Sequence, residues 1–188
     1  MSATSVLKAG DIVLRPATEA DIDARLAFGN DADIAEMYGK NRSDIRPLTR
    51  DGVQDWVGWL MSHPHAWIIE KDGSPIGEIR LDNMNKADRR TLLALGIFDP
   101  SRLGQGIGPV AIALVLAHAF GTLNLHRVSL RVLAYNSRAI RAYEKCGFRV
   151  EGRERETAFV NDVWHDDLMM GILCHEFVDP FRLKSGLD

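Results

Sequence analysis

Cysteine is scarce: the 188 residues contain only Cys146 and Cys174. They form no Cys-x-x-Cys pair and have no metal-ligand spacing, so neither a disulfide framework nor a metal centre is indicated. We expect two reduced thiols packed in the protein and no metal cofactor. Such use of cysteine is typical of a cytoplasmic protein.

Charge of one sign and long hydrophobic runs are also missing. The chain has 23 Lys and Arg against 26 Asp and Glu, with a formal net charge of −3, and no block of like charges occurs. Because nucleic-acid-binding domains concentrate Lys and Arg on one surface, we expect no nucleic-acid partner. The apolar run at 109–120 is too short to cross a bilayer, and the first residues lack a secretory pattern. The sequence therefore predicts a cytoplasmic protein with no membrane partner.

The order of strand-like and helix-like segments is that of a mixed α/β (α+β) protein. In chain order we expect a strand at 12–15, a helix N-capped by Thr18, a helix over 49–64, a hairpin around 71–74 with a bulge at Gly77, a central strand at 89–99, a helix at 109–120, a strand at 127–134, a helix at 137–146 and two final strand-like runs. Several strands followed by strand–helix alternation predict a single domain over 1–188, with its core at about 11–175 and a tail at 176–188.

The most informative stretch is a loop in which Gly104, Gly106 and Gly108 alternate before Pro109 and an apolar helix. Without Cβ atoms, several backbone N–H groups can converge on one anion at the positive end of the helix dipole. Neither a Walker loop nor the dinucleotide Gly-x-Gly-x-x-Gly spacing is present. On the loop alone, a tight strand-to-helix connection without a ligand is nearly as good an interpretation.

A second motif follows in "LAYNSRAIRAYEKCGFRV". Asn136 is predicted to cap a helix that Gly147 ends. Asn136, Ile140 and Tyr143 share one face of that helix. An amide and a phenol are thus expected at the crevice where two strand ends part, which is where open α/β sheets bind ligands.

The glycine loop followed by Asn-x-x-Ala-x-x-x-Tyr-x-Lys-x-Gly-Phe, from Asn136 to Phe148, resembles the acetyl-coenzyme A-dependent N-acetyltransferases of the GNAT superfamily. The stretches "VLRPATEADID" and "GSPIGEIRL" are similar to its ribosomal-protein N-terminal acetyltransferase branch. The resemblance implies a mixed central sheet of about six or seven strands with helices on both faces. It also implies acetyl-CoA as cosubstrate. Leu103 stands where the family pattern has Gln or Arg, so only the backbone cradle is expected to be kept.

The resemblance implies acetyl transfer to a primary amine, either a protein N-terminus or a small amine, by direct attack in a ternary complex. Tyr143 is then the expected general acid for the thiolate and Glu78 the general base. Asp99, His165 and ordered water stay open as alternatives for the base, while Cys146 is interpreted as packing. Residues implied to bind the cosubstrate are Ile97, Phe98, Leu103, Gly104, Gln105, Gly106, Ile107, Gly108, Asn136, Ala139 and Tyr143.

The acceptor amine is not identified by the sequence. Segment 28–64 is expected to form one wall of its groove, with Trp59 as a lining residue. The acidic residues Asp31, Asp33, Glu36 and Asp44 are available to attract an amine, although an exposed acidic loop explains them equally well. The oligomeric state stays open, with a homodimer as one alternative, since dimers are common among the relatives that the sequence resembles. Two other functions stay open: an acyl-CoA-binding sensor without transfer, and an acyltransferase with a longer acyl donor.

Overall fold

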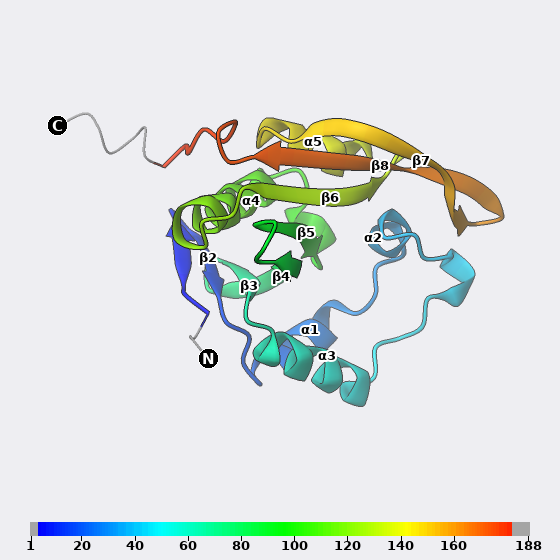
Figure 1. The fold of residues 1–188 in the computed structure, drawn as a ribbon. Coiled ribbons are helices and arrows are strands. Elements are labelled where there is room, and N and C mark those ends of the chain that lie inside the picture. The colour runs from blue at the N-terminus through cyan, green and yellow to red at the C-terminus, as the bar shows by residue number, and fades with distance from the viewer. Residues whose placement is uncertain (1–3, 182–188) are drawn as a thin grey trace.

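The computed structural model describes residues 4–181, through which one eight-stranded sheet runs in the order β1-β2-β3-β4-β5-β6-β8-β7 (Figure 1). All neighbouring strands are antiparallel except β5 and β6. The strands are β1 (Leu7–Ala9), β2 (Ile12–Arg15), β3 (Ala66–Lys71), β4 (Ser74–Asn85), β5 (Arg90–Ile97), β6 (Arg127–Leu133), β7 (Arg149–Val160) and β8 (Val163–Leu173). The helices and helical turns are α1 (Asp21–Phe28), α2 (Ala32–Met37), η1 (Arg42–Asp44), α3 (Arg50–Ser62), η2 (Pro100–Arg102), α4 (Ile107–Ala117), η3 (His118–Thr122) and α5 (Ser137–Lys145).

The mixed α+β architecture is confirmed, but the expected count of about six or seven strands was too low. The strand missed is β1, which has three residues and pairs with β2 around a turn at Gly10. Gly10 has φ +60°, a conformation that glycine adopts without steric cost. Three residues are too few to show an alternating pattern, so this strand left no signal of its own.

Helices cover both faces of the sheet, and β3 shows why. Ile68 packs with Leu60 of α3 in a small cluster on one face. Its neighbour Ile69 belongs to the main core, together with Ile112 and Leu116 of α4, on the other face. Side chains of a strand alternate between faces, so a strand buried on both sides must lie between two helical layers. Figure 1 shows α1 and α3 on one side and α4 on the other.

Three local expectations had different outcomes. The N-cap at Thr18 was wrong: α1 begins at Asp21, whose carboxylate instead accepts the N–H of Thr18 at 2.7 Å. The helix expected at 109–120 begins two residues earlier, at Ile107, with Pro109 in its first turn. The bulge is confirmed, since Ile69 pairs with Gly77 but Glu70 pairs with Pro75.

The tail of the chain packs back on its own fold as far as the structure describes it. The ring of Phe177 lies 5.6 Å from that of Phe120, and Phe181 also contacts the main core. Residues 182–188 of the predicted tail lie outside the described residues. Within residues 4–181 no helix has the length and apolarity needed to cross a membrane.

Candidate active site

The centre of the site is a gap between the two parallel strands. β5 and β6 pair only from Arg90–Leu92 to Arg127–Ser129, although both strands continue beyond that point. The N–H of Phe98 donates to Ile76 of β4, so backbone alternation turns the peptide groups of Leu95 and Ile97 toward the gap. The gap opens into a cavity of about 560 Å³. A stretch of strand edge there is left without a neighbouring strand.

The glycine loop closes one end of this cavity with unpaired donors. The N–H groups of residues 104–108 reach no carbonyl in the described part of the chain. Gly104 and Gly106 have φ of +77° and +79°, and α4 starts directly after them. Positive φ at alternate residues and a helix start together turn N–H groups outward, which suits an anion. The backbone of residues 104–108 therefore has the conformation expected of an anion-binding cradle.

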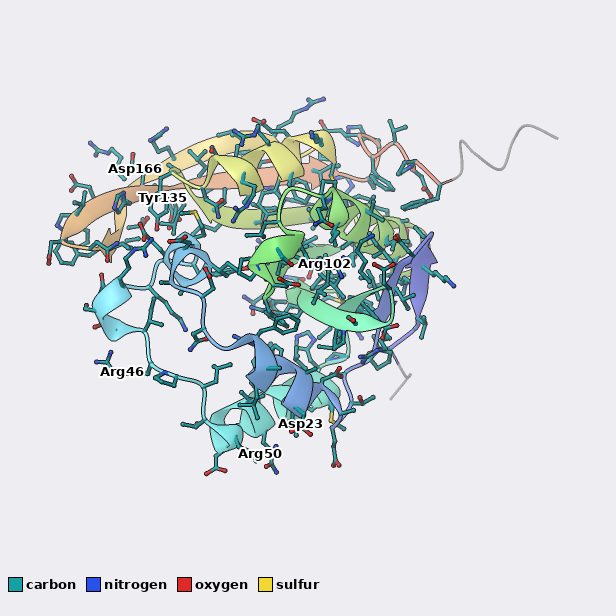
Figure 2. All side chains as sticks on the ribbon, turned by 180° about the vertical axis from the view of Figure 1, so that it is seen from behind. Asp23, Arg46, Arg50, Arg102, Tyr135 and Asp166 are labelled. Carbon is teal, nitrogen blue, oxygen red and sulfur yellow. The ribbon has the colours of Figure 1, made fainter. Side chains whose placement is uncertain are left out.

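Positive side chains surround the same end, and sequence reasoning missed them. Arg138, Arg141 and Lys145 line the cavity from α5 and have no ion pair in the described residues. Their spacing of three and four residues puts them on one helical face, which is the signal that could have found them. Arg102 of η2, labelled in Figure 2, adds a further cation, which lies 3.6 Å from Asp72 and 3.7 Å from Asp99. Several unneutralised cations favour a ligand with more than one phosphate.

Asn136 caps α5 as predicted. Its side-chain oxygen accepts the N–H of Ala139 at 3.1 Å, and its amide nitrogen donates to Met37 at 3.4 Å. Both side-chain polar atoms therefore have partners within the chain. Gly147, with φ +94°, ends the helix as expected. Asn136 and Ala139 both line the cavity, at the point where α2 meets α5.

Tyr143 lies in the same cavity with its hydroxyl unused. The residue is 7% exposed, its ring packs edge-on against Phe148 at 5.8 Å, and its hydroxyl makes no hydrogen bond with any described residue. Burial raises the pKa of Tyr143 to about 12. The phenol is therefore fully protonated at neutral pH and has a proton available for a partner in the cavity.

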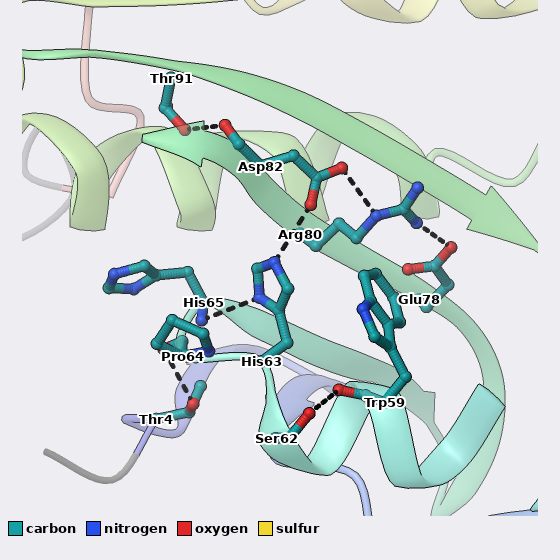
Figure 3. A network of polar contacts seen from close by, with 10 residues as sticks. All are labelled: Thr4, Trp59, Ser62, His63, Pro64, His65, Glu78, Arg80, Asp82 and Thr91. Carbon is teal, nitrogen blue, oxygen red and sulfur yellow. Dashed lines mark hydrogen bonds and ion pairs between the residues drawn. The ribbon is translucent and has the colours of Figure 1, made fainter. Parts of the chain in front are cut away.

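Glu78 brings a carboxylate to the other end of the gap. It is 9% exposed, its Oε1 atom accepts from Arg80, and its Oε2 atom has no partner in the described residues. Arg80 in turn contacts Asp82, which contacts His63, as Figure 3 shows. Burial outweighs the attraction of Arg80 and raises the pKa of Glu78. A raised pKa and an unsatisfied oxygen are the properties of a general base.

Tyr38 is the residue at this site that the sequence did not reveal. Its hydroxyl donates to the carbonyl of Leu95 at 3.0 Å, on the gap side of β5. A Cβ on Gly96 would lie 2.9 Å from that hydroxyl. The absence of a side chain at Gly96 therefore makes room for Tyr38 in the fold.

Two of the predicted cosubstrate residues do not line this cavity. Phe98 faces a second cavity and gives its N–H to Ile76, so its backbone is not free to pair with a pantetheine arm. The side chain of Gln105 turns back to Ser101, at 2.8 Å, and leaves only its N–H for a ligand. The predicted residues that do line the cavity are Ile97, Leu103, Gly104, Gly106, Ile107, Gly108, Asn136, Ala139, Tyr143 and Glu78.

The alternative catalytic residues are occupied elsewhere. The Asp99 carboxylate caps η2 through the N–H of Ser101 at 2.9 Å. The ring of His165 packs edge-on against Tyr135 at 4.6 Å, outside the cavity. Cys146 contacts the Pro109 carbonyl at 3.4 Å, and burial raises the pKa of its thiol to about 11. Such a thiol is almost entirely protonated at neutral pH and is a poor nucleophile.

A parted pair of parallel strands, a cradle of N–H groups and a buried phenol and carboxylate define the class of acyl-coenzyme A-dependent transferases. The family model described as acetyltransferase (GNAT) domain matches residues 11–149. Because the match covers most of the chain, the protein belongs to the GNAT acetyltransferase family.

Individual relatives agree with this assignment. The chain is 33% identical over 176 residues to "Probable N-acetyltransferase YjcK" of Bacillus subtilis, covering 89% of this chain and 97% of that one. It is 31% identical over 112 residues to the spermidine N(1)-acetyltransferase of Escherichia coli, but that alignment covers only 60% of each chain. The fold is similar to the crystal structure of spermidine N-acetyltransferase from Vibrio cholerae in complex with CoA and spermine, with a TM-score of 0.75, 24% identity, and coverage of 88% of this chain and 97% of that one.

Proposed function

We propose that the protein transfers an acetyl group from acetyl-CoA to a primary amine, on a small molecule or at a protein N-terminus, by direct attack in a ternary complex. The observation that carries this proposal is the gap between β5 and β6, which has phosphate-type donors at one end and the Glu78 and Tyr143 pair at the other. Acetyl-CoA, the cosubstrate of this family, supplies the activated acyl group and a thiolate leaving group.

The chain's residues fit that cosubstrate on structural grounds. The edge at Leu95 and Ile97 has no neighbouring strand, and it offers peptide groups to an amide-containing arm in the manner of an added strand when Tyr38 releases the Leu95 carbonyl. The N–H groups of residues 104–108 and the cations of α5 suit a pyrophosphate and a further phosphate. The fold itself does not require a glycine at position 108. A Cβ there would meet nothing within 4 Å, and the φ of Gly108 is not positive. Its absent side chain leaves space for a ligand against the backbone.

The catalytic roles of Glu78 and Tyr143 follow from the protonation state of each side chain. The Glu78 carboxylate accepts a proton from the ammonium group of the acceptor, and the neutral amine that results attacks the thioester. The raised pKa of Glu78 brings it closer to that of an amine and so makes this proton transfer less unfavourable. Tyr143 keeps its proton at neutral pH and donates it to the departing sulfur. The Ile97 N–H, which faces the gap because that of Phe98 faces β4, is the donor for the thioester oxygen.

Direct attack is tested by initial rates measured with both substrates varied. A ternary complex predicts lines that intersect in a double-reciprocal plot, and Cys146→Ser is expected to keep the activity. Parallel lines, together with loss of activity in Cys146→Ser, would show a covalent acyl-enzyme and end the proposal. A thermal-shift comparison of acetyl-CoA, succinyl-CoA and ATP serves as the binding control, because only a ligand of the folded state raises the melting temperature.

A further inference from the structure

A second cavity, of about 470 Å³, adjoins the proposed reaction site. Glu78 lines both cavities, so the carboxylate of the first is also reached from the second. The second cavity is enclosed by α1, α3, the segment between α2 and α3, and Phe98 at the end of β5. A volume of this size suits a ligand as large as an amino acid. Its position makes it the entry for the acceptor amine.

Three cations without counter-charges line this cavity. They are Arg25, Lys40 and Arg46, and none of them forms an ion pair within the described residues. Figure 2 shows Arg46 on the segment that leads from η1 to α3. Cations in a concave site without carboxylate partners form a binding site for an anion.

Arg25 is the innermost of the three by its contacts. Its guanidinium lies 4.6 Å from the centre of the Phe98 ring, donates to the Gly29 carbonyl at 2.6 Å, and reaches Asn30 at 3.2 Å. Asn30 also donates to the Arg46 carbonyl at 2.6 Å, which ties the two arginine segments together. Burial lowers the pKa of Arg25, and no carboxylate opposes this effect. A half-buried guanidinium with no anion beside it has the surroundings expected for a ligand's carboxylate.

The acidic residues of the same region do not offset these cations. Asp33 and Glu36 both pair with Arg42, and Asp31 caps α2, so three of the four acidic residues that we expected to attract an amine are used within the fold. Only Asp44 and Glu78 bring carboxylates to the lining. Asp44 accepts from Asn41 at 2.8 Å, and Glu78 is already paired with Arg80. A polyamine, with several positive charges, would meet net repulsion here.

We propose that this cavity binds the acceptor, and that the acceptor is an amine carrying a carboxylate, of the size of an α-amino acid with an apolar side chain. This inference rests on the proposed acetyl transfer. Arg25 and Arg46 hold the carboxylate, which leaves the amino group facing Glu78. Trp56 and Phe98, whose rings meet edge-on at 5.5 Å, form an apolar wall for the side chain. Trp59, the expected lining residue, instead lies beside Arg80 and His63, outside this cavity.

The test compares amines that differ only in the carboxylate. Acetyl transfer is measured to leucine and isoamylamine, to phenylalanine and phenethylamine, and to spermidine. We expect kcat/KM to be at least about tenfold higher for each amino acid than for its decarboxylated partner, as one charge-assisted contact requires. Arg46→Gln, on an exposed segment, is expected to reduce that ratio by about tenfold to a hundredfold while changing isoamylamine turnover little. Arg25→Gln should act in the same direction.

Arg50→Gln is the matched control, because Arg50 lies next to this region but pairs with Asp23 and does not line the cavity. In this variant the ratio of kcat/KM for each amino acid to that for its decarboxylated partner should equal the wild-type ratio. Binding of N-acetyl-leucine in the presence of coenzyme A, followed by calorimetry, gives a second readout without turnover. Two results together would overturn the inference and leave the acetyltransferase proposal intact. They are a higher kcat/KM for spermidine than for either amino acid, and a ratio of amino acid to decarboxylated amine that Arg46→Gln does not change. Absence of turnover with every amine, with N-acetyl-leucine binding lost in Arg46→Gln, would overturn the transfer proposal but keep the carboxylate site.

Discussion

Replacing Tyr143 by phenylalanine removes one oxygen atom and leaves the ring in place. The ring packs against Phe148 and belongs to the main core, whereas the hydroxyl has no partner in the described residues. Losing an unpaired hydroxyl costs the fold less than about 1 kcal/mol. Coenzyme A affinity should also change little, because the hydroxyl of Tyr143 is not part of the N–H cradle at residues 104–108.

Catalysis should respond very differently. A positioned general acid contributes about 10²–10⁴-fold to a rate, so kcat of Tyr143→Phe is expected to fall by about a hundredfold or more. The assay is thiol release from acetyl-CoA at saturating amine, paired with a melting curve and a coenzyme A titration. The loss should shrink with an acetyl thioester of a more acidic thiol, since a better leaving group needs less protonation.

Two results would refute this reasoning. A kcat within about threefold of the wild type would show that the proton does not come from Tyr143. A fall in melting temperature of more than about 4 °C, which corresponds to roughly 1 kcal/mol or more for a domain of this size, would show that the hydroxyl supports the fold instead.

Further predictions concern the base and the glycines. Burial raises the pKa of Glu78, so wild-type kcat/KM should rise with pH through a value above that of an ordinary carboxyl, and Glu78→Gln should lose that rising limb; an unchanged pH profile would exclude this base. Gly104→Ala, at φ +77°, should cost about 1–2 kcal/mol in chemical denaturation. Gly108→Ala, with open space around its Cβ position, should leave stability unchanged and weaken coenzyme A binding in calorimetry; unaltered binding would argue against a ligand there. Gly77→Ala places a Cβ 2.3 Å from the Gly96 carbonyl and should cost about 1–3 kcal/mol or more, and a neutral result would contradict the close approach of β4 and β5.

The parts of the site that the sequence predicted are those with local signatures. The glycine loop and the cap at Asn136 depend on residues a few positions apart, and both are found where expected. The long strands carry enough apolar residues to be recognised, whereas the three residues of β1 do not. Features carried by spacing and backbone conformation could thus be predicted directly.

The parts that were missed depend on contacts between distant segments. Tyr38 reaches Leu95 across 57 positions of the chain, and no pattern around Tyr38 indicates that contact. Trp59, which was expected to line the acceptor groove, lies outside the second cavity, whereas Trp56 lines it. The apolar stripe that buries α3 does not show which of its edges faces a cavity. The N–H direction at Phe98 depends on strand register, and a shift of one residue reverses it.

The central claim is that the cavity between β5 and β6 delivers an acetyl group to an amine. Its most direct test is the rate of thiol release from acetyl-CoA by the wild-type protein, with and without each amine of a mixed panel, and with mass spectrometry of the amine afterwards. The account predicts release that depends on one class of amine, with one N-acetylated product formed for each thiol. Coenzyme A that binds tightly, while no amine accelerates thiol release or gains an acetyl group, would contradict it.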